Sequence, residues 1–161
     1  HYIDKYGYIP FWIVVKILSF GIVSELYQIL KPENQAEIAK DFDVSVEQLI
    51  VYLPILANFR NLCAHEDILY DHRAQRDIED TIYHEQLHIP KLNGEYIYGK
   101  SDLFAIVLIL KQMLRKDDFF LLMSEMEYEI QILADKLKTI SIEKVLDRMG
   151  FPINYQQLIK L

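Results

Sequence analysis

Helix-start signals stand before most apolar segments of this chain, and they limit the folds that it can adopt. Ser45 and Gln48 are three positions apart and match a capping box, in which the two side chains bond reciprocally across the first turn of a helix. Pro10 suits the first position of another helix, and Ser101 and Ser141 suit the N-caps of two more. The pattern predicts an all-α fold.

The apolar periodicity and the stop signals set the expected bounds. We expect one domain over residues 1–161, with a central helix over 10–30 that Pro32 ends and a long helix over 46–70. Gly21 lies inside the first of these, where glycine costs about 1 kcal/mol relative to alanine, so a close helix–helix contact is expected there. An irregular insertion should follow residue 70, with a polar helical turn in 74–87 and a small hairpin in 89–98 around Asn93 and Gly94. The remaining helices are expected at 33–42, 101–115, 117–139 and 141–149, with a last turn in 153–161.

Composition narrows the function classes. With 52% apolar residues in 161, the chain can bury a sizeable core. Its single cysteine allows no disulfide framework, which favours a reducing compartment and a cytoplasmic location. Lys16 and Glu25 interrupt the most apolar stretch, so no membrane span is expected. The net charge of −7 disfavours a nucleic-acid binder with a broad basic surface. Because the chain begins with His1 rather than Met, we expect a C-terminal fragment of a longer protein.

Three chemically useful side chains lie close together late in the 46–70 helix. Arg60, Asn61 and His65 fall within an arc of roughly 140° on a helix. Histidine can accept or donate a proton near neutral pH, and arginine can hold a phosphate through two hydrogen bonds. Such a pair suits phosphodiester cleavage without a metal or another cofactor. One histidine does not easily serve as both base and acid, whereas two copies meeting at a two-fold axis would supply both.

The same stretch carries a resemblance to a known family. The string from Phe59 to His65, followed by Tyr70 and Arg73, resembles the signature of the bacterial abortive-infection (Abi-like, AbiD/AbiF-type) family within the HEPN superfamily, including its Rx4-6H motif. Upstream, the segment 11–21 is similar to the family's W-x5-L-S-F-G block, and 26–30 to its L-Y-x-x-L. The resemblance covers residues 8–73 and is fairly specific because two blocks occur in the same order.

This resemblance implies a HEPN-like helical bundle that acts as a homodimer. It implies a metal-independent endoribonuclease of phage defence or toxin–antitoxin systems, which leaves 2′,3′-cyclic phosphate and 5′-OH ends. Arg60 and His65 inherit the catalytic roles, Asn61 a polar supporting role, and Tyr70 and Arg73 less defined supporting roles. The implied partners are an RNA substrate and an RNA or protein antitoxin. The chain departs from the family at 66–68, where Glu66-Asp67-Ile68 replaces a second histidine and an arginine.

Two alternatives remain open from the sequence. The acidic balance favours a non-catalytic binding or dimerisation module for RNA or a partner protein. A literal H-E-x-x-H is formed by His84, Glu85 and His88, which in zinc hydrolases supplies two ligands and a general base. Pro90 follows this motif at once and no third ligand is indicated, so a solvated polar helical turn is the favoured interpretation of this stretch.

Overall fold

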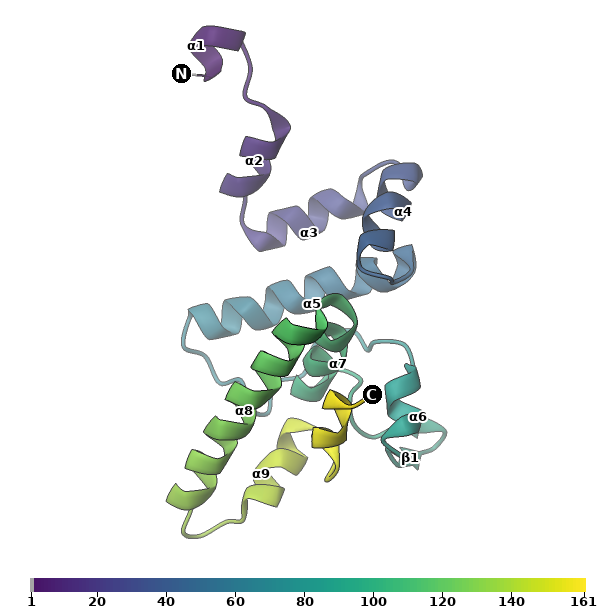
Figure 1. The fold of residues 1–161 in the computed structure, drawn as a ribbon, viewed down its shortest axis with the longest axis vertical. Helices are drawn as coiled ribbons and strands as arrows, with labels where there is room; N and C mark the ends of the chain where they lie inside the picture. The colour runs from purple at the N-terminus through teal and green to yellow at the C-terminus, as the bar shows by residue number, and fades with distance from the viewer. Residues whose placement is uncertain (1) are drawn as a thin grey trace.

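The computed structural model describes residues 2–161 and confirms the all-α prediction. Helices account for nearly all of the regular structure, and the only sheet in the described part of the chain is a two-stranded hairpin (Figure 1). The elements in chain order are α1 (Tyr2–Tyr6), α2 (Phe11–Ile17), α3 (Phe20–Gln28), α4 (Pro32–Asp41), α5 (Val46–Ala64), α6 (Ile82–Gln86), β1 (Lys91–Leu92), β2 (Glu95–Tyr96), α7 (Leu103–Met113), α8 (Lys116–Lys136), α9 (Ile142–Met149) and the 3₁₀ helix η1 (Tyr155–Ile159).

Helices α3, α4 and α5 enclose the smaller of two cores. Its buried residues are Tyr27, Ala39 and Leu49, one from each helix. The Tyr27 hydroxyl donates to the Gln35 carbonyl at 3.0 Å, and the Gln35 side chain donates back to the Tyr27 carbonyl at 2.9 Å. This reciprocal pair fixes α3 against α4, because buried polar groups are stable only when they are hydrogen-bonded.

The larger core surrounds α7, in which residues 104–109 are all buried. Helix α8 contributes Phe119 and Met123 to this core, and the C-terminal segment contributes Phe151, Tyr155 and Leu158. A helix that is apolar on all sides belongs at the centre of a domain, and α7 occupies that position.

Helix α5 belongs to both cores. Leu49 packs with α3 and α4, whereas Tyr52, Ile55 and Phe59 pack in the larger core. In Figure 1, α5 lies between α3 above and α7 and α8 below. The helix opens with the predicted capping box, since Gln48 N donates to Ser45 Oγ at 3.0 Å and Ser45 N donates to Gln48 Oε1 at 2.9 Å.

The single helix expected over 10–30 is wrong. Leu18 and Ser19 are extended, and Ser19 begins α3 by accepting a hydrogen bond from Ile22 N at 3.3 Å. The close contact expected at Gly21 is also absent, because a Cβ built there would meet only Ser19 Oγ, at 4.0 Å. Gly21 therefore borders open space.

The insertion after α5 is held by a buried polar cluster. Gly99 N donates to both oxygens of Asp102, at 3.1 and 3.0 Å, and Ala105 N donates to Asp102 Oδ1 at 3.0 Å. Asp102, not the expected Ser101, is thus the N-cap of α7. Burial raises the pKa of Asp102 to about 6 despite these donors. The hairpin predicted in 89–98 is confirmed, with Lys91 opposite Tyr96.

The first two helices project away from the two cores (Figure 1). Neither contains a buried residue, and Phe11 and Trp12 are both more than half exposed. Within residues 2–161, no single helix is long and apolar enough to cross a membrane; α4 and α5 meet the length and composition criteria only as a pair bent by 72°.

Gly150 offers a test of the packing around Asp102. It ends α9 with φ of 85°, and a Cβ there would lie 2.2 Å from Asp102 Cγ. We expect Gly150→Ala to lower the free energy of unfolding by about 3 kcal/mol, through the clash and the left-handed strain together. Gly94→Ala is the control, because Gly94 has φ of 90° but nothing within 4 Å, so strain alone should cost about 1 kcal/mol. Urea denaturation of both variants measures the difference, and equal losses would contradict the packing argument.

Candidate functional site

The motif helix ends earlier than the periodicity predicts. Helix α5 stops at Ala64 instead of residue 70, and Glu66 adopts a left-handed conformation with φ of 54°. Asp67 N then donates to the Leu62 carbonyl at 3.0 Å, and Glu66 N donates to the Cys63 carbonyl at 3.4 Å. These two bonds are those of a Schellman ending. The left-handed residue of such an ending is usually glycine, but here it is Glu66, so the sequence carries no stop signal at this point.

This ending places the three motif residues at an exposed helix terminus. Arg60 and Asn61 lie in the last turn of α5, His65 is its C-cap, and all three are exposed. Arg60 Nη1 donates to Asn61 Oδ1 at 3.2 Å, so the amide orients the guanidinium group. No other described residue bonds to the His65 ring. The structure thus leaves both the cation and the imidazole available to a ligand.

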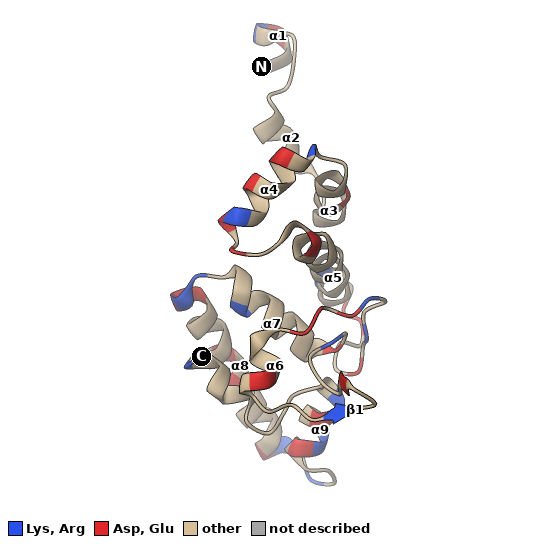
Figure 2. Cartoon of the chain, turned by 90° about the vertical axis from the view of Figure 1, so that its right-hand side faces the viewer, with Lys and Arg blue, Asp and Glu red and all other residues tan. Residues whose placement is uncertain are grey.

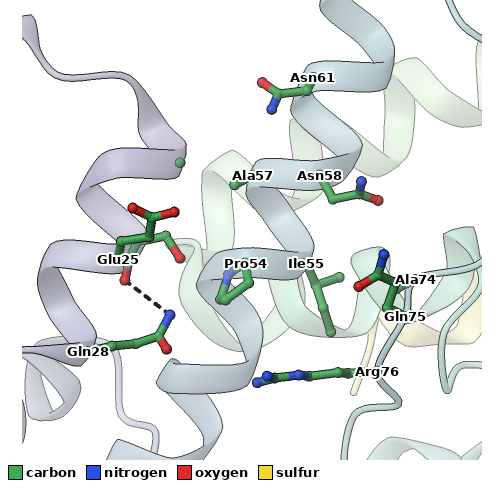
Figure 3. Close-up of a pocket in the computed structure, with 12 residues that line it drawn as sticks. Glu25, Gln28, Pro54, Ile55, Ala57, Asn58, Asn61, Ala74, Gln75 and Arg76 are labelled. Carbon is green, nitrogen blue, oxygen red and sulfur yellow. Dashed lines mark hydrogen bonds between the residues drawn. The ribbon is translucent and has the colours of Figure 1, made fainter.

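A groove of about 430 Å³ adjoins this terminus. Its walls are α3, the central and late turns of α5 and the segment 74–76 (Figure 3). The residues that line it are Gly21, Ser24, Glu25, Gln28, Pro54, Ile55, Ala57, Asn58, Asn61, Ala74, Gln75 and Arg76. Asn61 belongs both to this groove and to the motif.

Helical geometry aligns the groove with the motif histidine. Pro54, Asn58 and Asn61 line the groove from one stripe of α5, at spacings of four and three residues. The next position on that stripe is His65, four residues further on. A ligand lying along the stripe would therefore extend from the groove toward the imidazole.

A second histidine, His72, lies beside this stripe, and the sequence spacing does not predict it there. The His72 Nε2–H group donates to Asn58 Oδ1 at 2.7 Å, and the His72 ring meets the Phe59 ring edge-on, with centroids 5.0 Å apart. His72 is half-buried and is brought back to α5 by the turn after residue 66. Sequence spacing gave no signal for it, because the predicted continuation of α5 to residue 70 hides that turn.

The two supporting residues have different surroundings. Tyr70 is half exposed, and the described residues give its hydroxyl no hydrogen bond. Arg73 Nη2 donates to the Arg148 carbonyl at 2.8 Å, and Arg148 in turn pairs with Asp71 at 3.2 Å. Arg73 therefore ties the segment after the motif to α9, and its bonds do not reach Arg60 or His65.

The electrostatic surroundings are mixed. In the view of Figure 2, Lys and Arg residues are spread over several elements, with Asp and Glu residues among them. Glu66 and Asp67 directly follow the motif histidine and are exposed. Arg60 is thus a local cation in an acidic setting, which favours recognition through a few defined contacts over general attraction of a polyanion.

The H-E-x-x-H stretch has a structural role. His84 is fully buried, its Nε2–H group donates to the Gly99 carbonyl at 2.9 Å, and its Nδ1 accepts from Thr81 N at 3.0 Å. Both ring nitrogens are therefore occupied, whereas His88 is exposed. Across the described residues no cluster of three potential metal ligands occurs. His84 is not available to hold zinc.

A pH-dependent stability measurement tests this role. Burial lowers the pKa of His84 below its usual 6.5, so near that pH the folded protein binds fewer protons than the unfolded chain. The contribution of His84 is complete above pH 6.5 and is lost as the pH falls through its lowered pKa. We expect His84→Ala to cost about 3 kcal/mol at pH 7.5 and less at pH 5.

His88→Asn is the control, and it should change the stability by less than about 0.5 kcal/mol at either pH. Thermal shift with added zinc completes the test. A zinc-dependent rise in the melting temperature of the wild-type protein that His84→Ala abolishes would restore the metal interpretation.

Comparison with known proteins relates the first part of the chain to a family. Residues 1–71 match the family described as Abi-like protein. No curated protein and no solved structure matches the chain. The matched portion runs from α1 through α5 and includes Arg60, Asn61, His65 and Tyr70, but it ends before Arg73. Over this portion, which is less than half of the 161 residues, the chain is similar to Abi-like proteins.

Proposed function

We propose that the protein is a metal-independent endoribonuclease of the HEPN type, acting in bacterial phage defence by abortive infection or as a toxin. The observation that carries the proposal is the joint exposure of Arg60, Asn61 and His65 at the end of α5, beside a polar groove that includes Asn61. Similarity of residues 1–71 to Abi-like proteins supports the biological setting.

The reaction follows from the chemistry of these groups. His65 takes the proton from a ribose 2′-OH, and the resulting alkoxide attacks the adjacent phosphorus. Arg60 donates to the phosphate oxygens and offsets the charge that develops on them, while Asn61 holds the guanidinium group in place. The P–O5′ bond then breaks, which leaves a 2′,3′-cyclic phosphate and a 5′-OH. The departing 5′ oxygen needs a proton.

A second copy of the chain would supply that proton. A single His65 that has just accepted a proton from the 2′-OH is not placed to serve both sides of the phosphate at once. In a two-fold dimer, the His65 of each protomer would face one side of the scissile bond, one as base and the other as acid. The proposal therefore includes a homodimer, an RNA substrate, an RNA or protein antitoxin as its restraint, and the bacterial cytoplasm as its location.

The alternative is a non-catalytic module that binds RNA or a partner protein. It is favoured by Glu66 and Asp67 next to His65, and by the apolar side chains of α1 and α2 that no core covers. The two functions differ in whether RNA bound at the motif is cut.

Cleavage of labelled RNA in EDTA tests the proposal directly. We expect wild-type protein to cut, His65→Ala to lose at least about 100-fold in rate, and Arg60→Ala to lose about 100- to 1,000-fold. His88→Asn should retain full activity, since His88 is exposed and outside the motif. The products should carry cyclic phosphates. Binding of RNA without cleavage by the wild-type protein would favour the module instead.

Mixing experiments test the composite site. If both histidines of a dimer are needed, wild-type protein diluted with His65→Ala protein at constant total concentration should lose activity as the square of the wild-type fraction. Half wild-type protein would then retain about a quarter of the activity. Denaturation and joint refolding randomises the pairing. A loss that is linear in the wild-type fraction would show that each chain works alone.

A further inference from the structure

We propose that the groove between α3, α5 and the segment 74–76 binds one unstacked guanine base of the RNA, an inference that rests on the proposed ribonuclease function. The first support is its position. The groove shares Asn61 with the motif and lies on the stripe of α5 that leads to His65. A base held there would place its neighbouring phosphate toward Arg60.

Gly21 indicates that the groove is kept open. A glycine inside a helix is unfavourable, and no neighbouring backbone or side chain of this protein approaches closely enough to require it. Gly21 lines the groove, so the missing side chain leaves the backbone of α3 accessible from that side. Packing within the protein does not explain the glycine at position 21, whereas space for a ligand in the groove does.

Two charged side chains that line the groove have no protein partner. Glu25 and Arg76 are exposed and form no ion pair or hydrogen bond in the described part of the chain. Figure 3 shows Glu25 on α3, while Arg76 extends its guanidinium group from the far wall toward α3. The groove thus offers donors and acceptors that the fold itself does not use.

The charge balance selects the chemical class. One carboxylate and one guanidinium give the groove no net formal charge, so Glu25 opposes entry of a phosphate while Arg76 opposes a cation. A neutral, flat ligand with both donors and acceptors fits this lining, and single-stranded RNA presents its bases in that way. Pro54, Ile55 and Ala57 supply an apolar wall for the face of the ring.

The pairing of groups favours guanine among the four bases. Guanine carries two adjacent donors, N1–H and N2–H, which a carboxylate such as Glu25 can accept together. It also carries two adjacent acceptors, O6 and N7, which match a guanidinium such as Arg76. Adenine presents an amino donor where guanine has O6 and has no N1–H, so it would leave both charged groups partly unpaired.

Binding of short RNAs tests the proposal in the His65→Ala background, in which the proposed cleavage chemistry is removed. Fluorescently labelled pentauridine with one central guanosine should bind about 10-fold more tightly than the same RNA with adenosine, and inosine, which lacks the 2-amino group, should fall between them. Glu25→Gln and Arg76→Gln should each remove most of this preference. Glu33→Gln and Lys31→Gln, which change charges outside the groove, should leave it intact.

Gly21→Leu fills the groove without touching its charges. We expect it to abolish the guanine preference while keeping a melting temperature no lower than that of the wild-type protein, because the added side chain enters open space and leucine favours a helix. Gly21→Ala, which adds one methyl group, should retain most of the preference. Equal affinity for the guanosine and adenosine RNAs, or an unchanged preference in Gly21→Leu, would overturn the proposal.

Cleavage by wild-type protein, measured beside these titrations, separates the two proposals. Guanine-selective binding that Gly21→Leu removes, without any cleavage, would reject the nuclease and retain the base site. Cleavage that is indifferent to guanine and to Gly21→Leu would retain the nuclease and reject the base site.

Discussion

The carboxylate of Asp102 is the contact on which the C-terminal half of the structure depends. It caps α7, the most deeply buried helix, and its two oxygens also accept from Gly99 N. Gly99 in turn presents its carbonyl to His84, and Gly150 lies directly against the carboxylate. The loop at Gly99, the start of α7 and the end of α9 therefore meet at the carboxylate of Asp102, and α6 is joined to them through His84 and Gly99. A buried polar network of this kind is stable only when every member is satisfied.

The candidate site depends on that arrangement indirectly. Helix α7 provides the surface on which Tyr52, Ile55 and Phe59 of α5 pack, and the orientation of α5 decides where its last turn opens to solvent. The segment after the motif is fixed from the other side, because Arg73 bonds to the end of α9 and His72 bonds to Asn58. The exposed motif thus lies at the end of a helix whose preceding turns are packed in the core and whose following segment is hydrogen-bonded back to the fold.

Much of the fold was predictable from local signals. The capping box at Ser45 and the hairpin turn at Asn93 and Gly94 were read correctly, because each acts over a few residues. The errors have two causes. Glu66 ends α5 from a position that usually holds glycine, so the usual marker is missing there. Ser19 is itself a common N-cap residue, but apolar residues on both sides of it favoured one continuous helix.

The site was predictable only in part, for a related reason. Arg60, Asn61 and His65 were found because they share one turn of a helix and a family signature. The groove was not, because Gly21 and Arg76 are far apart in sequence and meet only through packing. The sequence favoured a solvated turn at His84 over a metal ligand, yet the ring is buried against the Gly99 carbonyl, a contact that spacing alone does not predict.

Because α5 packs in both cores, the end of the family match and the end of the folding unit fall at different places in the chain. Similarity to Abi-like proteins covers residues 1–71 only. The residues that bury one side of α5, however, include many that lie beyond residue 71. Cutting the chain there would leave Tyr52, Ile55 and Phe59 as a continuous apolar strip facing water, and such a fragment would aggregate or seek a substitute partner. The end of the matched segment is therefore not an end of the folding unit. The unmatched C-terminal half serves as an obligatory cover for the helix that carries the motif.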